Sequence, residues 1–135
     1  MKDGRPTYTY NWLGLQRYTV AAQQALPSGK VTLRLEFAYD GGGMGKGGTG
    51  TLFVNGKKVA AGRIEQTQCC AYSADEGADV GADEGTPVTE AYKVPFTFTG
   101  KIGKVTIELK EMKTAEKEQA ENSHKEAAHK NALSD

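Results

Sequence analysis

Carboxylates gather in one short stretch of the chain, SADEGADVGADEGTPV at residues 73–88. Crowded carboxylates repel one another unless water or a cation screens them, and oxygen ligands suit Ca²⁺. The spacing differs from that of an EF-hand loop, which has Asp-x-Asp-x-Asp-Gly followed by a glutamate. A solvated acidic loop is therefore the main interpretation. The alternatives are a calcium site, or an ion pair between one of these acids and Arg34 or Arg63. The calcium ligands would be Asp75, Asp79 and Asp83, and no other cofactor is expected.

Aromatic side chains and one arginine near the N-terminus form a second candidate site. Trp12 and Tyr18 could stack on sugar rings, and Arg17 could bind a sulfate group through two parallel N–H donors. Aromatic residues in strands more commonly serve core packing, which is the preferred interpretation here. The ligand-binding alternative assigns Trp12, Arg17 and Tyr18 to a glycan or a sulfated ligand.

Seven of the ten residues from Gly41 to Gly50 are glycine. Gly43, Gly45 and Gly48 match the pattern G-x-G-x-x-G, but that motif binds phosphate only where a helix follows at once. Here TLFV follows, which predicts a strand. The segment is therefore interpreted as a loop that joins two antiparallel strands, and no nucleotide site is predicted.

Groups suited to catalysis are few. A hydrolytic triad needs a histidine held against a serine or cysteine, and both histidines lie in a charged C-terminal segment. Cys69 and Cys70 are adjacent, so a disulfide between them would be strained. We expect them to serve as two small apolar residues at a strand end. No self-sufficient active site is predicted.

Length and charge limit the classes of protein that remain. A chain of 135 residues is one domain by size. The 17 basic and 17 acidic residues give a formal charge of zero, which argues against a nucleic-acid or anionic-membrane partner. No apolar run approaches the roughly 20 residues of a membrane span, and no signal peptide is recognised. The expected location is cytoplasmic by default, or periplasmic or secreted within a longer parent.

Apolar residues recur with period two in three stretches, at residues 7–11, 30–39 and 104–110. In the third, Val105, Ile107 and Leu109 are expected to point inward. Asn55-Gly56 is a strong hairpin signal, with arms at about residues 51–54 and 57–64, and PFTFTG adds a further strand near Phe96. Such short strands predict an all-β fold, an antiparallel β-sandwich or jelly-roll-like domain over residues 1–110.

Residues 111–135 have a different composition, without proline or glycine and rich in helix-forming residues. They predict a helical tail. The helix would be polar all round, because its apolar residues form no stripe.

Three segments together resemble the C-terminal region of long bacterial arylsulfatases. They read YNWLGLQRY at residues 10–18, FAYDGGGMGKGGTGTLFVNGKKVAAGRIE at 37–65 and SADEGADVGADEGTPV at 73–88. The resemblance spans residues 3–110 and implies a β-rich accessory domain that follows a sulfate-ester-hydrolysing catalytic domain. Sulfatases carry C-x-P-x-R or S-x-P-x-R at the nucleophile. The sequence CCAYS at residues 69–73 lacks both the proline and the arginine, so no catalytic residue can be transferred.

The resemblance leads to one main expectation and one alternative. The chain is expected to be a non-catalytic C-terminal accessory domain or fragment of an arylsulfatase-type hydrolase, with the sulfatase catalytic domain as its partner. The alternative is a glycan- or sulfated-ligand-binding β-sandwich module, stabilised by calcium. In the resembled region another strand precedes KDGRPTYTYN, so the first strand is expected to be missing here. An open strand edge recruits other chains, and weak self-association is therefore expected.

Overall fold

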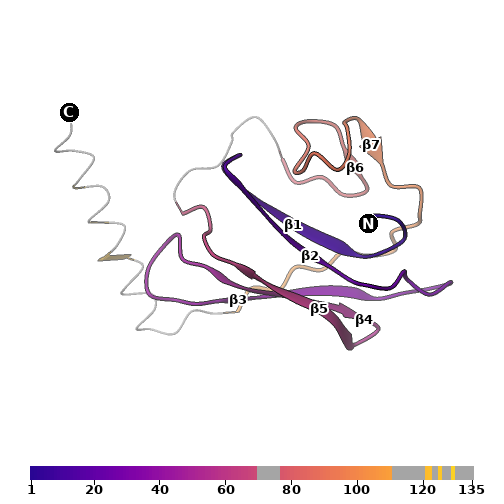
Figure 1. The fold of residues 1–135 in the computed structure, drawn as a ribbon, viewed down its shortest axis with the longest axis horizontal. Helices are drawn as coiled ribbons and strands as arrows, with labels where there is room; N and C mark the ends of the chain where they lie inside the picture. Colours follow the sequence, from indigo (N-terminus) through magenta and orange to yellow (C-terminus); the bar gives the residue numbers. More distant parts are fainter. Residues whose placement is uncertain (70–76, 111–120, 123–124, 126–128, 130–135) are drawn as a thin grey trace.

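The computed structural model describes residues 1–69, 77–110, 121–122, 125 and 129. Their fold is all-β, as the sequence predicts, with antiparallel pairing in every sheet. The strands are β1 Thr7–Trp12, β2 Gln16–Ala21, β3 Leu33–Tyr39, β4 Gly48–Val54, β5 Lys57–Ile64, β6 Ala82–Asp83 and β7 Phe96–Thr97. They form three sheets: β1-β2, β3-β4-β5 and β6-β7 (Figure 1).

The N-terminal hairpin joins β1 to β2. Its register pairs Tyr8 with Val20 and Tyr10 with Tyr18, so these four side chains share one face. The turn has Leu13 and Gly14 at φ values of 53° and 75°. The expected strand at residues 7–11 is confirmed as β1, whereas sequence reasoning missed β2.

The three-stranded sheet contains the best-predicted elements. Asn55 and Gly56 both have positive φ, as the hairpin turn between β4 and β5 requires. The side chain of Asn55 also accepts a hydrogen bond of 2.9 Å from the backbone N–H of Thr32, just before β3 begins. This contact and the return bond from the Asn55 N–H to the Thr32 carbonyl fix the start of β3 against the turn.

The core forms where the N-terminal hairpin packs on one face of this sheet. β2 contacts β5 and β4, and Figure 1 shows the hairpin lying across the sheet. Val20, Leu52 and Ile64 are buried there, and Ile64 is 0% exposed. We call this side of the sheet the inner face.

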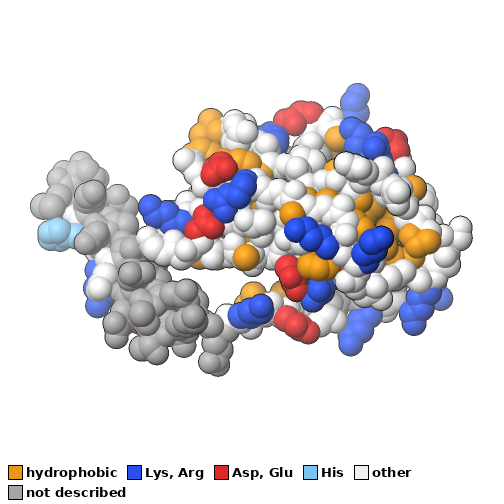
Figure 2. Space-filling model, turned by 60° about the horizontal axis from the view of Figure 1, so that its bottom comes forward, with side chains coloured by type: hydrophobic (Ala, Val, Ile, Leu, Met, Phe, Trp, Pro, Cys, Tyr) orange, Lys and Arg blue, Asp and Glu red, His pale blue; other side chains and the backbone are white. Residues whose placement is uncertain are grey.

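The hairpin leaves the β3 part of the inner face uncovered. Register places the apolar residues of β3 on the same face as Leu52 and Gly50, yet each of them is between 40 and 45% exposed: Leu33, Leu35, Phe37 and Tyr39. Figure 2 shows hydrophobic side chains reaching the surface of the molecule between lysine, arginine and acidic side chains. The apolar surface of this domain is therefore only partly buried.

The prediction of a strand at residues 104–110 with inward apolar residues is wrong. None of these residues is in a strand, and Val105, Ile107 and Leu109 are 55%, 82% and 91% exposed. Alternation defines a face for an extended segment, but a strand also needs a hydrogen-bonded neighbour. Within the described structure this segment has none.

A smaller lobe contains β6 and β7. Their two-residue pairing is extended by a 2.8 Å bond from the Phe98 N–H to the Gly81 carbonyl. In the same lobe the ring centroids of Tyr92 and Phe96 lie 5.3 Å apart. β7 places a strand within the PFTFTG segment, where the sequence predicted one.

The predicted domain boundary after residue 110 and the polar helical tail at 111–135 lie mostly outside the described residues. Glu121, Asn122, Lys125 and His129 are described, and all four are helical and exposed. In the part of the chain that the structure covers, no helix is both long and apolar enough to span a bilayer.

Candidate functional site

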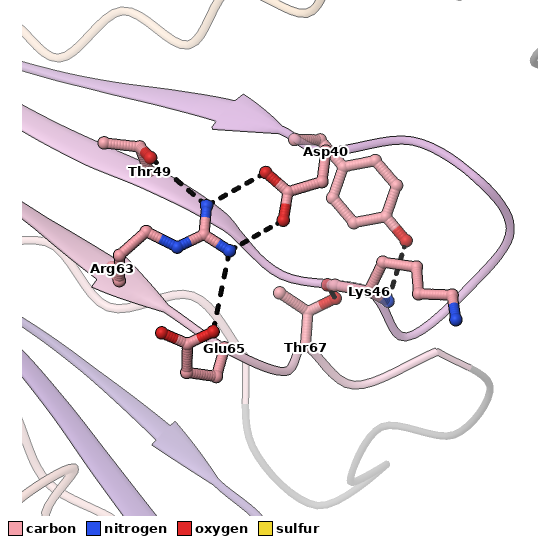
Figure 3. A network of polar contacts seen from close by, with 7 residues as sticks. Asp40, Lys46, Thr49, Arg63, Glu65 and Thr67 are labelled. Atoms are coloured by element: carbon pink, nitrogen blue, oxygen red, sulfur yellow. Dashed lines mark hydrogen bonds and ion pairs between the residues drawn. The ribbon is translucent and has the colours of Figure 1, made fainter.

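An ion pair lies at the base of the glycine-rich loop, residues 40–47, which connects β3 to β4. Asp40 directly follows β3, and Arg63 lies on β5. The guanidinium donates from Nη1 to Asp40 Oδ1 at 2.9 Å and from Nη2 to Oδ2 at 2.7 Å (Figure 3). Nη1 also donates to the Thr49 hydroxyl at 3.3 Å, and Glu65 approaches Nη2 at 3.6 Å. A two-bond Arg–carboxylate pair of this kind fixes orientation as well as distance.

Each partner of this pair stabilises the charged form of the other. The hydrogen bond from Arg63 lowers the pKa of Asp40 below its ordinary value, and the positive charge of Arg63 acts in the same direction. The hydrogen bond to Asp40 raises the pKa of Arg63 above its ordinary value. Both side chains are about half exposed, 45% for Arg63 and 44% for Asp40, so the pair acts through geometry more than through a strong field.

Farther along the loop, two side-chain hydroxyls form hydrogen bonds with backbone groups of the loop (Figure 3). The Tyr39 hydroxyl donates to the Gly43 carbonyl at 2.5 Å and accepts from the Lys46 N–H at 3.0 Å. On the other side, the Thr67 hydroxyl donates to the Lys46 carbonyl at 2.7 Å. The Thr67 N–H also donates to the Gly45 carbonyl at 3.3 Å. Contacts therefore reach the loop from both the β3 end and the segment after β5.

Glycine is required where the loop returns to the sheet. A Cβ atom at Gly47 would lie 2.3 Å from the Ile64 carbonyl oxygen and 2.6 Å from that of Glu65. A Cβ at Gly48 would lie 2.5 Å from the Ala38 carbonyl oxygen and from the Phe37 ring. The glycines here permit close approach of backbones and lead into β4. The expectation that a strand follows this loop is confirmed.

The arrangement suits recognition more than chemistry. Its charged groups are one neutralised ion pair, Glu65 beside it, and Lys46 on the loop. The loop instead presents partly exposed backbone that these hydrogen bonds hold in place, since Gly47 alone among residues 40–47 is buried. Such a surface can make close contact with another protein or domain.

The second predicted site is divided between the two faces of the N-terminal hairpin. Trp12 and Tyr18 share a face with Val20, which points towards the sheet, and both are half-buried. Arg17 pairs with Asn11 and therefore points to the opposite face. The structure therefore places Trp12 and Tyr18 on one face of the hairpin and Arg17 on the other.

Arg17 has a protein partner of its own. Its Nη2 donates to Glu90 Oε1 at 2.8 Å, which connects β2 to the lobe of β6 and β7. The Arg17 side chain is 27% exposed, and its Nε atom is buried without a hydrogen-bond partner.

The acidic segment is only partly described. Asp75 lies outside the described residues, Asp79 is exposed, and Asp83 is half-buried on β6. The Tyr92 hydroxyl donates to Asp83 and accepts from the Val88 N–H at 3.0 Å. Burial raises the pKa of Tyr92, and the bond to Asp83 raises it further. Over residues 1–69 and 77–110 no group of three or more His, Cys, Asp or Glu is placed to hold a metal. The calcium site stays a prediction.

Two further sequence predictions concern side-chain roles: an alternative ion pair from Arg34 or Arg63 to the acidic segment, of which Asp75 and Glu76 lie outside the described residues, and the role of the cysteines. Arg34 pairs with Glu36 at 2.6 Å and Arg63 with Asp40, so neither pairs with a described residue of the acidic segment. Cys69 is disulfide-bonded, so the expectation that it serves as a small apolar residue at a strand end is wrong. Cys70 lies outside the described residues.

Sequence reasoning missed the Asp40–Arg63 pair. The available signal was an acid directly after a strand and an arginine near the end of the following hairpin, but joining them requires the register of both strand pairs.

Comparison with known proteins adds no relative: no protein-family model matches the chain, and neither does a curated protein or a solved structure.

Proposed function

We propose that this chain is a C-terminal accessory domain or fragment of an arylsulfatase-type sulfuric ester hydrolase. The catalytic residues would belong to a separate catalytic domain. Its all-β fold would be a β-sandwich, with the N-terminal hairpin as part of one layer and β3–β5 as the other. The role of the domain is to pack against the catalytic domain and to shape the entrance for substrate.

The observation that carries this proposal is the fixed shape of the glycine-rich loop. Glycine loses more chain entropy on ordering than any other residue, so an ordered run of glycines is costly unless specific contacts offset it. Asp40, Tyr39 and Thr67 supply such contacts, from two sides of the loop. The loop also belongs to the longest of the three segments that resemble arylsulfatases. An exposed backbone kept in one shape favours close docking of a partner domain, because little further ordering is needed on binding.

The test uses a bacterial arylsulfatase of the resembled family truncated before its C-terminal region. This chain alone should not turn over p-nitrophenyl sulfate. Mixed with the truncated enzyme, it should bind in calorimetry and raise the melting temperature and sulfatase activity of that enzyme. Saturable hydrolysis by the chain alone, or the absence of binding, would contradict the proposal.

A matched pair of variants locates the docking surface. Arg63→Met removes the contact at the base of the loop and should weaken binding. Arg34→Met removes another arginine of the same sheet that is also paired with an acid, but leaves the loop contacts in place. Equal binding by both variants would show that the loop is not the docking surface.

One observation favours the second candidate function, a module that binds a glycan or sulfated ligand. The Arg17 guanidinium binds the carboxylate of Glu90, whose side chain is 77% exposed, and a sulfate group could take the place of that carboxylate. Trp12 and Tyr18 would then contribute packing only, from the other face of the hairpin. Binding to a sulfated glycan array that is lost in Arg17→Lys and kept in Arg5→Lys would support this module, while no binding by the unmodified chain would remove it.

A further inference from the structure

Two apolar rows of the described structure are exposed and have the same spacing. One is the inner-face row of β3, Leu33, Leu35, Phe37 and Tyr39. The other is Val105, Ile107 and Leu109, in the segment that forms no strand. Residues two apart share a face of an extended chain, so each row would form one face if its segment were paired in a sheet.

β3 also has a free edge. The order β3-β4-β5 gives it a hydrogen-bonded neighbour on one side only among the described residues. The strand contains no proline, and the irregularity of this sheet lies between β4 and β5 and not at β3. A regular apolar edge strand is a template for the addition of another strand.

We propose that a second copy of this chain completes this edge. Residues 104–110 of each copy add as an antiparallel strand to β3 of the other, which makes a two-fold exchanged dimer with two equal interfaces. The added segment has as many residues as β3, and its backbone makes no hydrogen bond to β3 of its own chain in the described structure. This inference is independent of the proposed function, because it uses the β3 edge and not the glycine-rich loop.

Charge separates the two antiparallel registers in which all three apolar residues of the segment 104–110 lie opposite apolar residues of β3. In one of them Leu33 lies opposite Leu109, Leu35 opposite Ile107 and Phe37 opposite Val105, with six residue pairs between residues 33–38 and 104–109. Arg34 then stands opposite Glu108, and Glu36 opposite Thr106. In the other register Leu35, Phe37 and Tyr39 lie opposite Leu109, Ile107 and Val105. Glu36 then faces Glu108 and Arg34 faces Lys110, which are like-charge pairs that destabilise a sheet. The formal charge of zero also means that two copies do not repel each other at long range.

The first test measures self-association of the full chain by sedimentation equilibrium over a range of concentrations. A monomer–dimer equilibrium is expected. Ile107→Lys should raise the dimer dissociation constant by about tenfold or more, because it replaces a buried apolar contact by a charge. Thr106→Lys is the matched control: it adds the same charge on the other face, opposite Glu36, and should leave dimerisation unchanged or tighter.

The second test traps the pairing by mixing a tagged Leu35→Cys copy with an untagged Ile107→Cys copy under mild oxidation. A covalent tagged–untagged dimer is expected, and it should form much less with Thr106→Cys, whose side chain faces away. A monomer at every concentration, equal effects of Ile107→Lys and Thr106→Lys, or a cross-link within one chain carrying both cysteines would overturn the proposal.

Discussion

Arg63 and Asp40 form a two-bond ion pair that crosses the strand between them. Asp40 follows β3 and Arg63 lies on β5, while β4 runs between these strands. The distances of 2.9 and 2.7 Å join both guanidinium nitrogens to both carboxylate oxygens. The first residue of the glycine-rich loop is thereby held to the far edge of the sheet, so the loop and the β4–β5 hairpin are linked.

Arg63→Lys should loosen the glycine-rich loop while leaving the sheet intact. Lysine keeps the positive charge but cannot form two parallel bonds to one carboxylate. Amides of residues 40–47 should therefore exchange with solvent faster in hydrogen-exchange measurements, while those of β4 and β5 keep their protection. Arg34→Lys is the control, because Arg34 pairs with Glu36 away from the loop. Identical loop exchange in both variants would show that the loop does not depend on this pair.

Stability should fall with acid in a way that depends on Asp40. Its pKa is lowered in the folded protein by Arg63, so the pair contributes fully above the ordinary carboxyl pKa of about 3.9. That contribution is lost as the pH falls through the lower pKa of the folded state. In urea unfolding at a series of pH values, Asp40→Asn should be less stable than the unmodified chain at neutral pH, and the difference should vanish in acid. In a chain that already carries Arg63→Met, adding Asp40→Asn should not change how stability depends on pH. If Asp40→Asn lowered the stability of the unmodified chain by the same amount at every pH, the role of this ion pair would be contradicted.

Tyr39→Phe should lower stability and loosen the middle of the loop. The hydroxyl makes two bonds to the loop backbone, each contributing about 0.5–1.5 kcal/mol, and the residue is half exposed, so the lower end is expected. Urea unfolding measures the loss. Tyr18→Phe removes a hydroxyl that has no hydrogen-bond partner in the described structure and should have little effect. Equal losses in the two variants would mean that the loop contacts do not contribute.

The parts of the fold that sequence predicts best are those specified locally. Asn55-Gly56 encodes its own turn, because both residues tolerate positive φ, and the arms follow from it. β2 was missed for the opposite reason. Its turn places Leu13 at positive φ, a conformation that a leucine rarely adopts and that composition does not signal.

Features that depend on strand register or on a partner strand could not be predicted from the sequence. Arg17 and Tyr18 are neighbours in the chain, so they looked like one site, but adjacent residues of a strand face opposite ways. Residues 104–110 alternate as clearly as β3 does, yet alternation does not say which strand lies alongside. The Asp40–Arg63 pair needs two registers at once, which local patterns do not contain.

Gly62→Ala should destabilise the contact between the N-terminal hairpin and the sheet. A Cβ at Gly62 would lie 2.9 Å from Val20 Cγ2, and Val20 is buried and stiff at χ1. Overpacking of this kind costs about 1–3 kcal/mol, more than the 0.4–1 kcal/mol or so that alanine gains by restricting the unfolded chain. Thermal and urea unfolding should therefore show a net loss.

Two further variants distinguish crowding against Val20 from a general effect of replacing glycine: the control Gly77→Ala, and Val20→Ala combined with Gly62→Ala. Gly77→Ala meets no atom within 4 Å and needs no positive φ, so it should be neutral or slightly stabilising. Val20→Ala should cost stability by itself, because it empties part of the core. In the double variant the two losses should not add, since the smaller side chain makes room for the new methyl group. Additive losses, or a Gly62→Ala protein as stable as Gly77→Ala, would mean that Val20 of β2 does not pack against Gly62 of β5.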